Sequence, residues 1–250
     1  MPHTQTQMAD LTGKIALVTG ASRGIGASVA RGLAERGADV VINYRSKGPR
    51  AEEVAEQVRA LGRRAWLAPA DITDEMQVQA MMRVVEEAGR LDALVLNASG
   101  GLEKDKPADY AMQLNLSAQT RLVDLVLPLM PRGACIAFIT SHLAHFHGRK
   151  AVPALYEPVA ASKKAGEEAL RARLPELNAK GIRLVIVSGD MIEGTITPKL
   201  MERAQRGSIE ARRAQAGSLP TVEEFAAAIV RAVSDEGAQS GETVFVGSTD

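Results

Sequence analysis

Three glycines fall within seven residues of the turn at residues 19–26, which reads Thr-Gly-Ala-Ser-Arg-Gly-Ile-Gly. Glycine accepts positive φ angles and, because it has no Cβ, lets the backbone approach a ligand closely. An apolar run precedes the turn and an amphipathic segment follows it, so a helix N-terminus would direct free N–H groups at an anion. The spacing is not the common Gly-x-Gly-x-x-Gly, and an ordinary strand-to-helix turn is the alternative. The turn predicts a phosphate site suited to a dinucleotide pyrophosphate.

Short apolar runs rich in β-formers alternate with segments of helical periodicity along the chain. Continuously apolar strands separated by helices indicate a parallel sheet covered on both faces, with ligands at the carboxyl ends of the strands. We therefore expect an α/β fold with a single Rossmann-type doubly wound sheet of about seven strands. The predicted strands are residues 15–19, 39–43, 64–68, 93–97, 135–140, 183–187 and 243–246, and the predicted helices are 25–36, 50–61, 74–89, an arc near 108–130, 160–180 and 221–235.

Composition limits the possible partners and the location of the protein. The 250 residues are 46% hydrophobic, and 30 basic residues balance 30 acidic ones, so nothing favours nucleic acid or an anionic membrane. Cys135 is the one cysteine and is expected to pack as a small hydrophobic side chain. No apolar stretch approaches the roughly 20 residues of a membrane span, so we expect a cytoplasmic protein. Residues 1–10 are expected to be a flexible tail and 11–250 one domain.

Several short motifs follow the predicted strands in order, and together they resemble the short-chain dehydrogenase/reductase family over nearly the whole chain after residue 10. They are the glycine turn, Asp71-Ile72, the run Leu-Asn-Ala-Ser-Gly at 96–100, Asn115, and Ile-Thr-Ser at 139–141. The resemblance implies that Asp71 and Ile72 contact the adenine, that the Asn97 region shapes the cofactor pocket and that Ser141 hydrogen-bonds a substrate carbonyl. Asp71 could instead cap a turn, and Asn115 could meet backbone carbonyls.

The resemblance also implies a set of site residues. Catalytic roles are expected for Tyr156, Lys163, Ser141 and Asn115, with no metal. Cofactor contacts are expected at Gly20, Ser22, Arg23, Gly24, Ile25, Gly26, Asn43, Arg45, Asp71, Ile72, Asn97, Ala98, Lys163 and Gly189.

The segment after the second predicted strand bears on the choice of nicotinamide cofactor. An acidic residue there would bind the ribose 2′-hydroxyl and repel a 2′-phosphate. Residues 43–47 read Asn-Tyr-Arg-Ser-Lys with no acid, and Arg23 lies on the adjoining turn. Arginine offers a bidentate fork for phosphate, so we predict that NADP(H) is preferred over NAD(H). The alternative is that these cations only solvate the surface.

The segment expected to carry the proton donor departs from the family's usual Tyr-x-x-x-Lys. Val159 stands where that pattern has tyrosine, and the nearest tyrosine, Tyr156, lies seven positions before Lys163. Seven residues are nearly two helical turns, which places both side chains on one face with their Cα atoms about 10 Å apart, against about 6 Å for four residues. Pro158 is typical of a first helical turn, so Tyr156 should lie just before the helix.

The longer spacing is similar to the Tyr-x6-Lys arrangement of a divergent branch that includes NADPH-dependent enoyl-acyl-carrier-protein reductases. Ser188 before Gly189 and the loop at 97–100 favour that branch, whereas Ser141, Asn115 and the Ser162-Lys163 pair also suit a ketoreductase. The resemblance implies hydride transfer to an activated C=C or C=O of an acyl thioester, in fatty acid or polyketide metabolism. Tyr156 would then stabilise the carbonyl oxygen, with Lys163 nearby.

Other readings of the chain stay open. Three of the four histidines lie at 142–147, where one could supply the proton in place of Tyr156 or, less readily, bind a metal. A displaced tyrosine could also mark an inactive NADP(H)-binding sensor or partner subunit, and the fold also hosts lyases and epimerases. The charged stretch at 199–217 suggests a mobile flap, and residues 190–217 a substrate lid. By resemblance, the apolar stripe of 160–180 would assemble a homotetramer or dimer.

Overall fold

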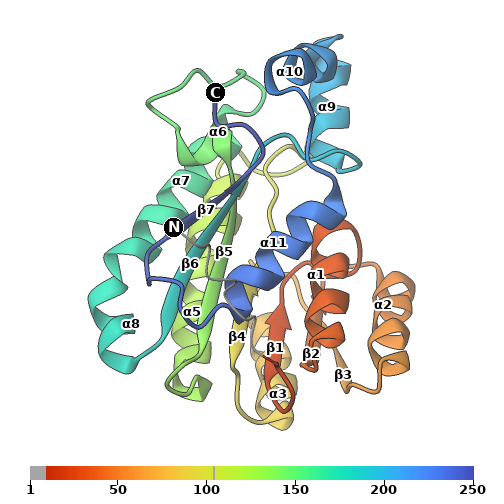
Figure 1. The fold of residues 1–250 in the computed structure, drawn as a ribbon, viewed down its shortest axis with the longest axis vertical. Helices are drawn as coiled ribbons and strands as arrows, with labels where there is room; N and C mark the ends of the chain where they lie inside the picture. Colours follow the sequence, from red (N-terminus) through yellow and green to blue (C-terminus); the bar gives the residue numbers. More distant parts are fainter. Residues whose placement is uncertain (1–9, 104) are drawn as a thin grey trace, which may run out of the picture.

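The computed structural model describes residues 10–103 and 105–250, and within them seven parallel strands form one sheet in the order β3-β2-β1-β4-β5-β6-β7 (Figure 1). The predicted doubly wound α/β fold is confirmed. The strands are β1 (Ile15–Val18), β2 (Asp39–Tyr44), β3 (Ala65–Pro69), β4 (Ala93–Leu96), β5 (Cys135–Ser141), β6 (Arg183–Gly189) and β7 (Thr243–Val246). Nearly all of the expected tail, residues 1–9, lies outside the described residues.

Alternate residues of the strands pack against different layers of helices. Leu17 of β1 joins the cluster built with α3 (Glu75–Ala88), α5 (Gln119–Val126), α7 (Glu157–Ala172) and α8 (Leu174–Lys180). Val18 joins the other cluster, built with α1 (Gly24–Glu35), α2 (Gly48–Ala60) and α11 (Val222–Ser234). The two layers lie on opposite faces of the sheet in Figure 1. Two-sided burial explains why the strand sequences are continuously apolar instead of alternating. No helix among the described residues is long and apolar enough to span a membrane.

The arc predicted near 108–130 is one helical path with three changes of pitch. It runs through α4 (Tyr110–Met112), the π-helical turn η1 (Gln113–Ala118), α5 and the 3₁₀ turn η2 (Leu127–Leu129). Such π turns widen a helix locally and are frequent at functional sites. Asn115 lies within this one and is 1% exposed. The irregular turn therefore places a polar side chain inside the core next to α7.

The prediction of one helix at residues 160–180 is wrong in two respects. The helix begins earlier, and it is divided into two. α7 begins at Glu157, with Tyr156 as its N-cap and Pro158 in its first turn, as the Pro158 argument predicted. The path breaks at Arg173, and α8 begins at Leu174 with Pro175 in its first turn. Proline has no N–H and its ring clashes with the carbonyl four residues before it, so the helix ends ahead of Pro175.

The stretch expected to be a flap folds as two helices, α9 (Ile196–Ala204) and α10 (Ser208–Ala216). A further short helix, α6 (His142–His145), follows β5 directly and was not predicted. Figure 1 places α9 and α10 at the same end of the molecule as α6, beyond the carboxyl ends of the strands. The charged sequence at 199–217 is thus ordered helix, and its mobility stays a prediction.

Gly166 sets how closely α7 can approach the π turn. A Cβ on this residue would lie 2.2 Å from the Asn115 carbonyl oxygen and 3.3 Å from Cζ of Phe138. Gly166→Ala should therefore lower the free energy of unfolding by about 1–3 kcal/mol, because overpacking outweighs the better helix propensity of alanine. Urea denaturation measures the change. Gly48→Ala is the control, since its Cβ would meet only Tyr44 at 3.8 Å; equal effects of the two substitutions would contradict the close approach.

Candidate active site

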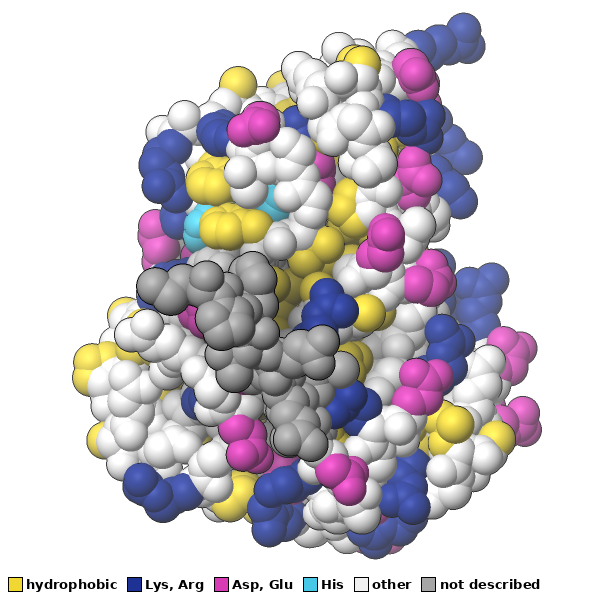
Figure 2. Space-filling view, viewed as in Figure 1, with side chains coloured by type: hydrophobic (Ala, Val, Ile, Leu, Met, Phe, Trp, Pro, Cys, Tyr) yellow, Lys and Arg dark blue, Asp and Glu magenta, His cyan; other side chains and the backbone are white. Residues whose placement is uncertain are grey.

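A cleft of about 1300 Å³ opens at the carboxyl ends of the strands. Every residue predicted to contact the cofactor, from Gly20 to Gly189, lies in its wall, together with Tyr156. Ser141 and Asn115 are not part of that wall. The Ser141 side chain hydrogen-bonds Tyr156, the Asn115 side chain hydrogen-bonds the Gly100 carbonyl, and both of these partners line the cleft. Hydrophobic side chains are visible in the hollow beneath α9 and α10 (Figure 2). The fold thus brings residues from the whole length of the chain to one cavity.

The glycine turn is held in shape by Asn97. Gly20 and Gly24 have positive φ angles of 65° and 55°, and a Cβ on Gly26 would lie 2.6 Å from both Asn97 Nδ2 and the Gly20 carbonyl oxygen. Asn97 Nδ2 donates to the Thr19 carbonyl at 2.9 Å. These contacts fix the turn, and Asn97 also lines the cleft. Gly26 is therefore required by close packing, and Gly20 and Gly24 suit their positive φ angles. α1 begins at Gly24 and has no acidic residue in its first turn.

Asn43 does similar work from the neighbouring strand. Its Oδ1 accepts from the Gly20 backbone N–H at 3.2 Å, and its Nδ2 donates to the carbonyls of Ala68 and Ala70 at 3.0 and 3.1 Å. The side chain is 1% exposed. Asn43 thus joins β2, β3 and the glycine turn, a structural role that the sequence did not distinguish from ligand contact.

Arg45, at the end of β2, faces two side chains across the cleft. Its Nη1 donates to the Tyr110 hydroxyl at 2.7 Å and lies 3.8 Å from Asp71 Oδ2. Burial is the main reason that the pKa of Tyr110 is raised. Asp71 also accepts from the backbone and hydroxyl of Thr73, the turn-capping role considered as its alternative. Tyr110 was missed because only the fold brings it to Arg45.

Further cations stand near this end of the cleft. Arg23, Lys47 and Arg50 line the cavity beside Arg45. Arg23 is the N-cap of α1, and Lys47 is the N-cap of α2. Positive side chains thus gather where two helices begin, which is an arrangement suited to phosphate groups.

Tyr156 and Ser141 meet at the other end of the cleft. The Tyr156 hydroxyl lies 3.1 Å from Ser141 Oγ, and Tyr156 is 5% exposed. Burial raises the pKa of the phenol, against a smaller lowering by the hydrogen bond to Ser141. The phenol is therefore protonated at neutral pH. The cap position before α7 turns Tyr156 toward β5, while Val159 packs beside it with Ala144 and Ala160.

Lys163 lies in the same wall and is almost completely buried. It is 9% exposed, and burial lowers the pKa of its ammonium to about 8. The described residues place no hydrogen bond between Lys163 and Tyr156, although both side chains line the cleft. The shared helix face expected from the seven-residue spacing stays a prediction. At neutral pH most of this lysine carries its charge into the cleft.

Asn115 connects the loop after β4 to α7. Its Nδ2 donates to the Gly100 carbonyl at 2.9 Å and to Ser162 Oγ at 3.0 Å. Its Oδ1 is buried without a hydrogen-bond partner. Ser162 in turn donates to the Val159 carbonyl. This chain of contacts fixes the helix turn that precedes Lys163.

The three histidines near Ser141 have separate partners. His142 contacts Ser188 Oγ at 2.8 Å, His145 contacts Glu167 at 2.9 Å, and His147 contacts Glu157 at 2.6 Å. Burial lowers the pKa of His142 to about 4, so its imidazole is uncharged at neutral pH and is a poor proton donor. Within residues 10–103 and 105–250, no group of three His, Cys, Asp or Glu side chains is placed to hold a metal.

The buried ammonium of Lys163 gives a pH-dependent prediction for the cofactor-free protein. Below pH 8 the lysine is charged in both the folded and the unfolded state, so its desolvation cost is fully present. As pH rises from about 8 to 10.5 the folded state loses the proton first, and that cost disappears. Lys163→Met should therefore be more stable than wild type by about 2–3 kcal/mol at pH 7.

Urea unfolding at pH 7 and pH 9.5 measures this difference, which should narrow at the higher pH. Lys164→Met is the matched control, because Lys164 is less buried and pairs with Glu168. A Lys163→Met variant less stable than wild type at pH 7 would contradict the burial cost.

Comparison with known proteins agrees with this fold. Residues 14–205 match the short chain dehydrogenase family. The 3-oxoacyl-[acyl-carrier-protein] reductase FabG of Staphylococcus aureus is 34% identical over 197 residues, covering 76% of this chain and 78% of FabG. The hydroxynaphthalene reductase arp2 of Aspergillus fumigatus is 47% identical over 100 residues, 40% of this chain and only 36% of arp2.

The chain likewise spans little more than half of the related Metarhizium robertsii protein, 58% of its length. The angucycline C-6 ketoreductase LanV, solved with NADP, superposes with a TM-score of 0.79 at 27% identity, over 97% of this chain and 98% of LanV. The family match covers most of the sequence, and the structural likeness covers nearly all of it. This chain belongs to the short-chain dehydrogenase family.

Proposed function

We propose that this protein is an NADPH-dependent ketoreductase acting on a ketone within a largely apolar carbon skeleton, of the 3-oxoacyl or polyketide class. The contact between the Tyr156 hydroxyl and Ser141 Oγ, at 3.1 Å, carries this proposal. It places two hydroxyl groups side by side, that of Tyr156 in the cleft wall and that of Ser141 next to it. A carbonyl oxygen can accept a hydrogen bond from each of them.

The residues at the other end of the cleft fit NADP(H). Gly26 lets the turn pack against Asn97 and Gly20 where no Cβ would fit, and the start of α1 carries no acidic side chain in its first turn. The pyrophosphate would lie on the turn from Gly20 to Gly26, with the 2′-phosphate among Arg23, Arg45 and Lys47. The expectation of NADP(H) is further supported by the NADP held by LanV.

When bound, NADPH supplies a hydride to the carbonyl carbon. Tyr156 gives its phenolic proton to the carbonyl oxygen, so that C=O becomes CH–OH and the phenolate is reprotonated from solvent. Ser141 donates a hydrogen bond to the same carbonyl oxygen and so holds it next to the phenol. The Lys163 ammonium lies in the same wall, where its positive charge favours the phenolate that the transfer leaves behind. Asn115 fixes the backbone from which Lys163 projects.

The lining around Tyr156 supports an apolar substrate. Leu143, Phe146, Pro153, Val159 and Met191 contribute to the cleft wall. A wall of this kind binds carbon skeletons by burial of apolar surface. FabG is named for a 3-oxoacyl substrate and LanV for an angucycline, both of which present a ketone on an extended carbon framework.

Enoyl reduction is the second candidate, and the seven-residue spacing from Tyr156 to Lys163 favours it. In that reaction the hydride goes to the β-carbon of an α,β-unsaturated thioester, and the phenol stabilises the enolate oxygen. The likeness to the enoyl-reductase branch stays a prediction. So do the homotetramer or dimer and the cytoplasmic location.

Tyr156→Phe tests the proton donor. It should lower kcat for ketone reduction at least about tenfold, while NADPH binding stays near wild type, because only a hydroxyl is removed. Oxidation of NADPH is followed at 340 nm with an acetoacetyl thioester, a 1-tetralone-type aryl ketone and a crotonyl thioester. Tyr44→Phe is the control, since Tyr44 does not line the cleft.

Each outcome has a defined meaning. Turnover of either ketone but not the crotonyl thioester supports ketoreduction, and the reverse result would select the enoyl candidate. Tight NADPH binding with no turnover of any of the three would favour a sensor. Wild-type activity in Tyr156→Phe would remove Tyr156 from the mechanism.

Arg45→Ala tests the cofactor preference. Loss of the guanidinium should lower the ratio of kcat/KM for NADPH to that for NADH by about tenfold, because a charge-assisted phosphate contact is lost. Arg31→Ala is the control, since Arg31 pairs with Glu35 on the exposed side of α1. An unchanged ratio, or comparable use of both cofactors by wild type, would defeat the assignment.

A further inference from the structure

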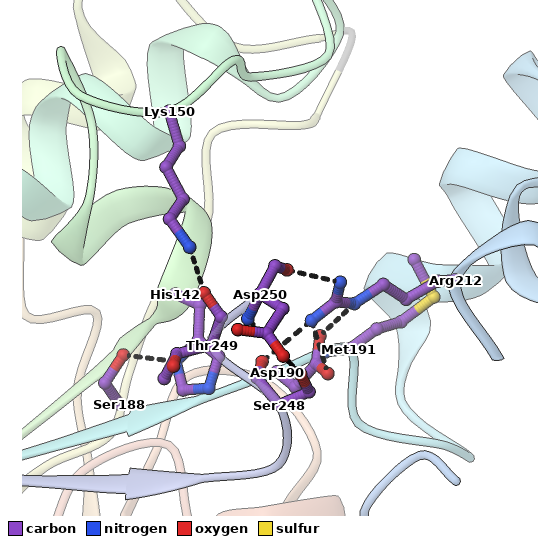
Figure 3. Close-up of polar contacts among 9 residues, drawn as sticks. All are labelled: His142, Lys150, Ser188, Asp190, Met191, Arg212, Ser248, Thr249 and Asp250. Carbon is purple, nitrogen blue, oxygen red and sulfur yellow. Dashed lines mark hydrogen bonds and ion pairs between the residues drawn. The ribbon is translucent and has the colours of Figure 1, made fainter. Parts of the chain in front are cut away.

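Arg212, on α10, binds three residues from two separate parts of the chain (Figure 3). Its Nε and Nη2 donate to the two oxygens of the Asp190 carboxylate at 2.8 and 2.9 Å. Its Nη2 also donates to the Ser248 carbonyl at 2.7 Å, and its Nη1 to the Asp250 carbonyl at 2.8 Å. The Arg212 and Asp190 side chains are 17% and 6% exposed, so this is a bidentate pair largely shielded from water.

Asp190 is anchored in the sheet. It directly follows Gly189, the last residue of β6, and its Oδ1 accepts from the Met191 backbone N–H at 2.7 Å. The chain after β7 passes so close that a Cβ on Gly247 would lie 2.6 Å from Asp190 Cβ. The carboxylate therefore has a fixed position at the carboxyl edge of the strands.

By contrast, α10 has no buried residue among its nine. Glu202 of α9 accepts from the backbone N–H groups of Gly207 and Ile209, which ties the two helices to each other. Arg213 adds an ion pair with Glu193 in which both side chains are well exposed. Exposed ion pairs contribute little to stability, whereas a shielded bidentate pair fixes the relative position of its two side chains. Arg212 is thus the main polar attachment of α10 to the sheet.

The segment 248–250 extends this attachment across the cleft. Lys150 Nζ donates to the Thr249 carbonyl, between the two carbonyls that Arg212 binds. Lys150 belongs to the loop from α6 to α7, shortly before Tyr156. Figure 3 shows Lys150 and Arg212 reaching this segment from opposite sides. Both side chains line the cleft.

We infer that Arg212 is a positioning residue that holds α9 and α10 over the substrate end of the cleft, and that joins them through residues 248–250 to the loop carrying Tyr156. The inference rests on the proposed function only for its effect on catalysis. The attachment itself can be measured by hydrogen exchange, without any catalytic turnover.

Hydrogen exchange measured by mass spectrometry tests the attachment directly. In Arg212→Met, peptides from residues 196–216 should exchange at least about tenfold faster than in wild type, because removing one partner of a shielded pair frees local opening. Peptides from α11 should be unchanged. Arg213→Met is the matched control, with the same loss of charge on the same helix, and should stay within about threefold of wild type.

Two further variants separate positioning from a general loss of stability. Arg212→Lys keeps the positive charge but lacks the bidentate guanidinium. It should therefore recover only part of the wild-type protection against hydrogen exchange. Asp190→Asn should accelerate exchange in the same peptides, and combining it with Arg212→Met should add little, because both remove one interaction. Additive effects, or exchange in Arg212→Met equal to that in Arg213→Met, would overturn the inference.

Kinetics give the catalytic readout. Arg212→Met should raise KM for the ketone about tenfold, with kcat within about threefold of wild type. We expect this because α9 and α10 shape the substrate wall and touch none of the reacting atoms. Unchanged KM would overturn this role. If wild type reduces no ketone while exchange still responds to Arg212→Met, the attachment stands and the proposed function fails.

Discussion

The hydrogen bond between Ser141 and Tyr156 is the contact on which the site depends. It joins the last residue of β5 to the residue that caps α7, so two elements from different layers must meet with their ends aligned. Gly166 permits the close approach of α7 to the π turn, and Asn115 then secures the loop after β4 against the same helix. The sheet and its helices act as a frame that fixes one phenol against one hydroxyl.

The same packing buries the Lys163 ammonium, which lowers the stability of the folded protein. Lys163 lies on α7 two turns after Tyr156, and its burial disfavours the charge that the proposed mechanism places beside a phenolate. Groups with strongly shifted pKa values are frequent at functional sites. The π turn and the unpartnered Oδ1 of Asn115 belong to the same region. Two departures from regular structure therefore lie against α7, the helix that Tyr156 caps.

Sequence patterns were sufficient for the sheet, because apolar runs mark the strands, most clearly the buried central ones, and the glycine turn marks the cofactor end. They also placed Tyr156 ahead of α7 through Pro158. They failed where residues distant in sequence must meet. Tyr110 meets Arg45 across 65 positions and Arg212 meets Asp190 across 22, and neither pair has a local signature. The break before Pro175 and the helices α9 and α10 were readable in principle, but charged segments that bury few residues resemble loops.

A crystal structure with NADP⁺ and a ketone substrate or alcohol product tests the central claim most directly. The account predicts the Tyr156 hydroxyl and Ser141 Oγ both within about 3 Å of the substrate oxygen, with Lys163 behind the phenol. A Tyr156 ring turned away from the ligand, with Val159 or His142 facing the reacting oxygen, would contradict it.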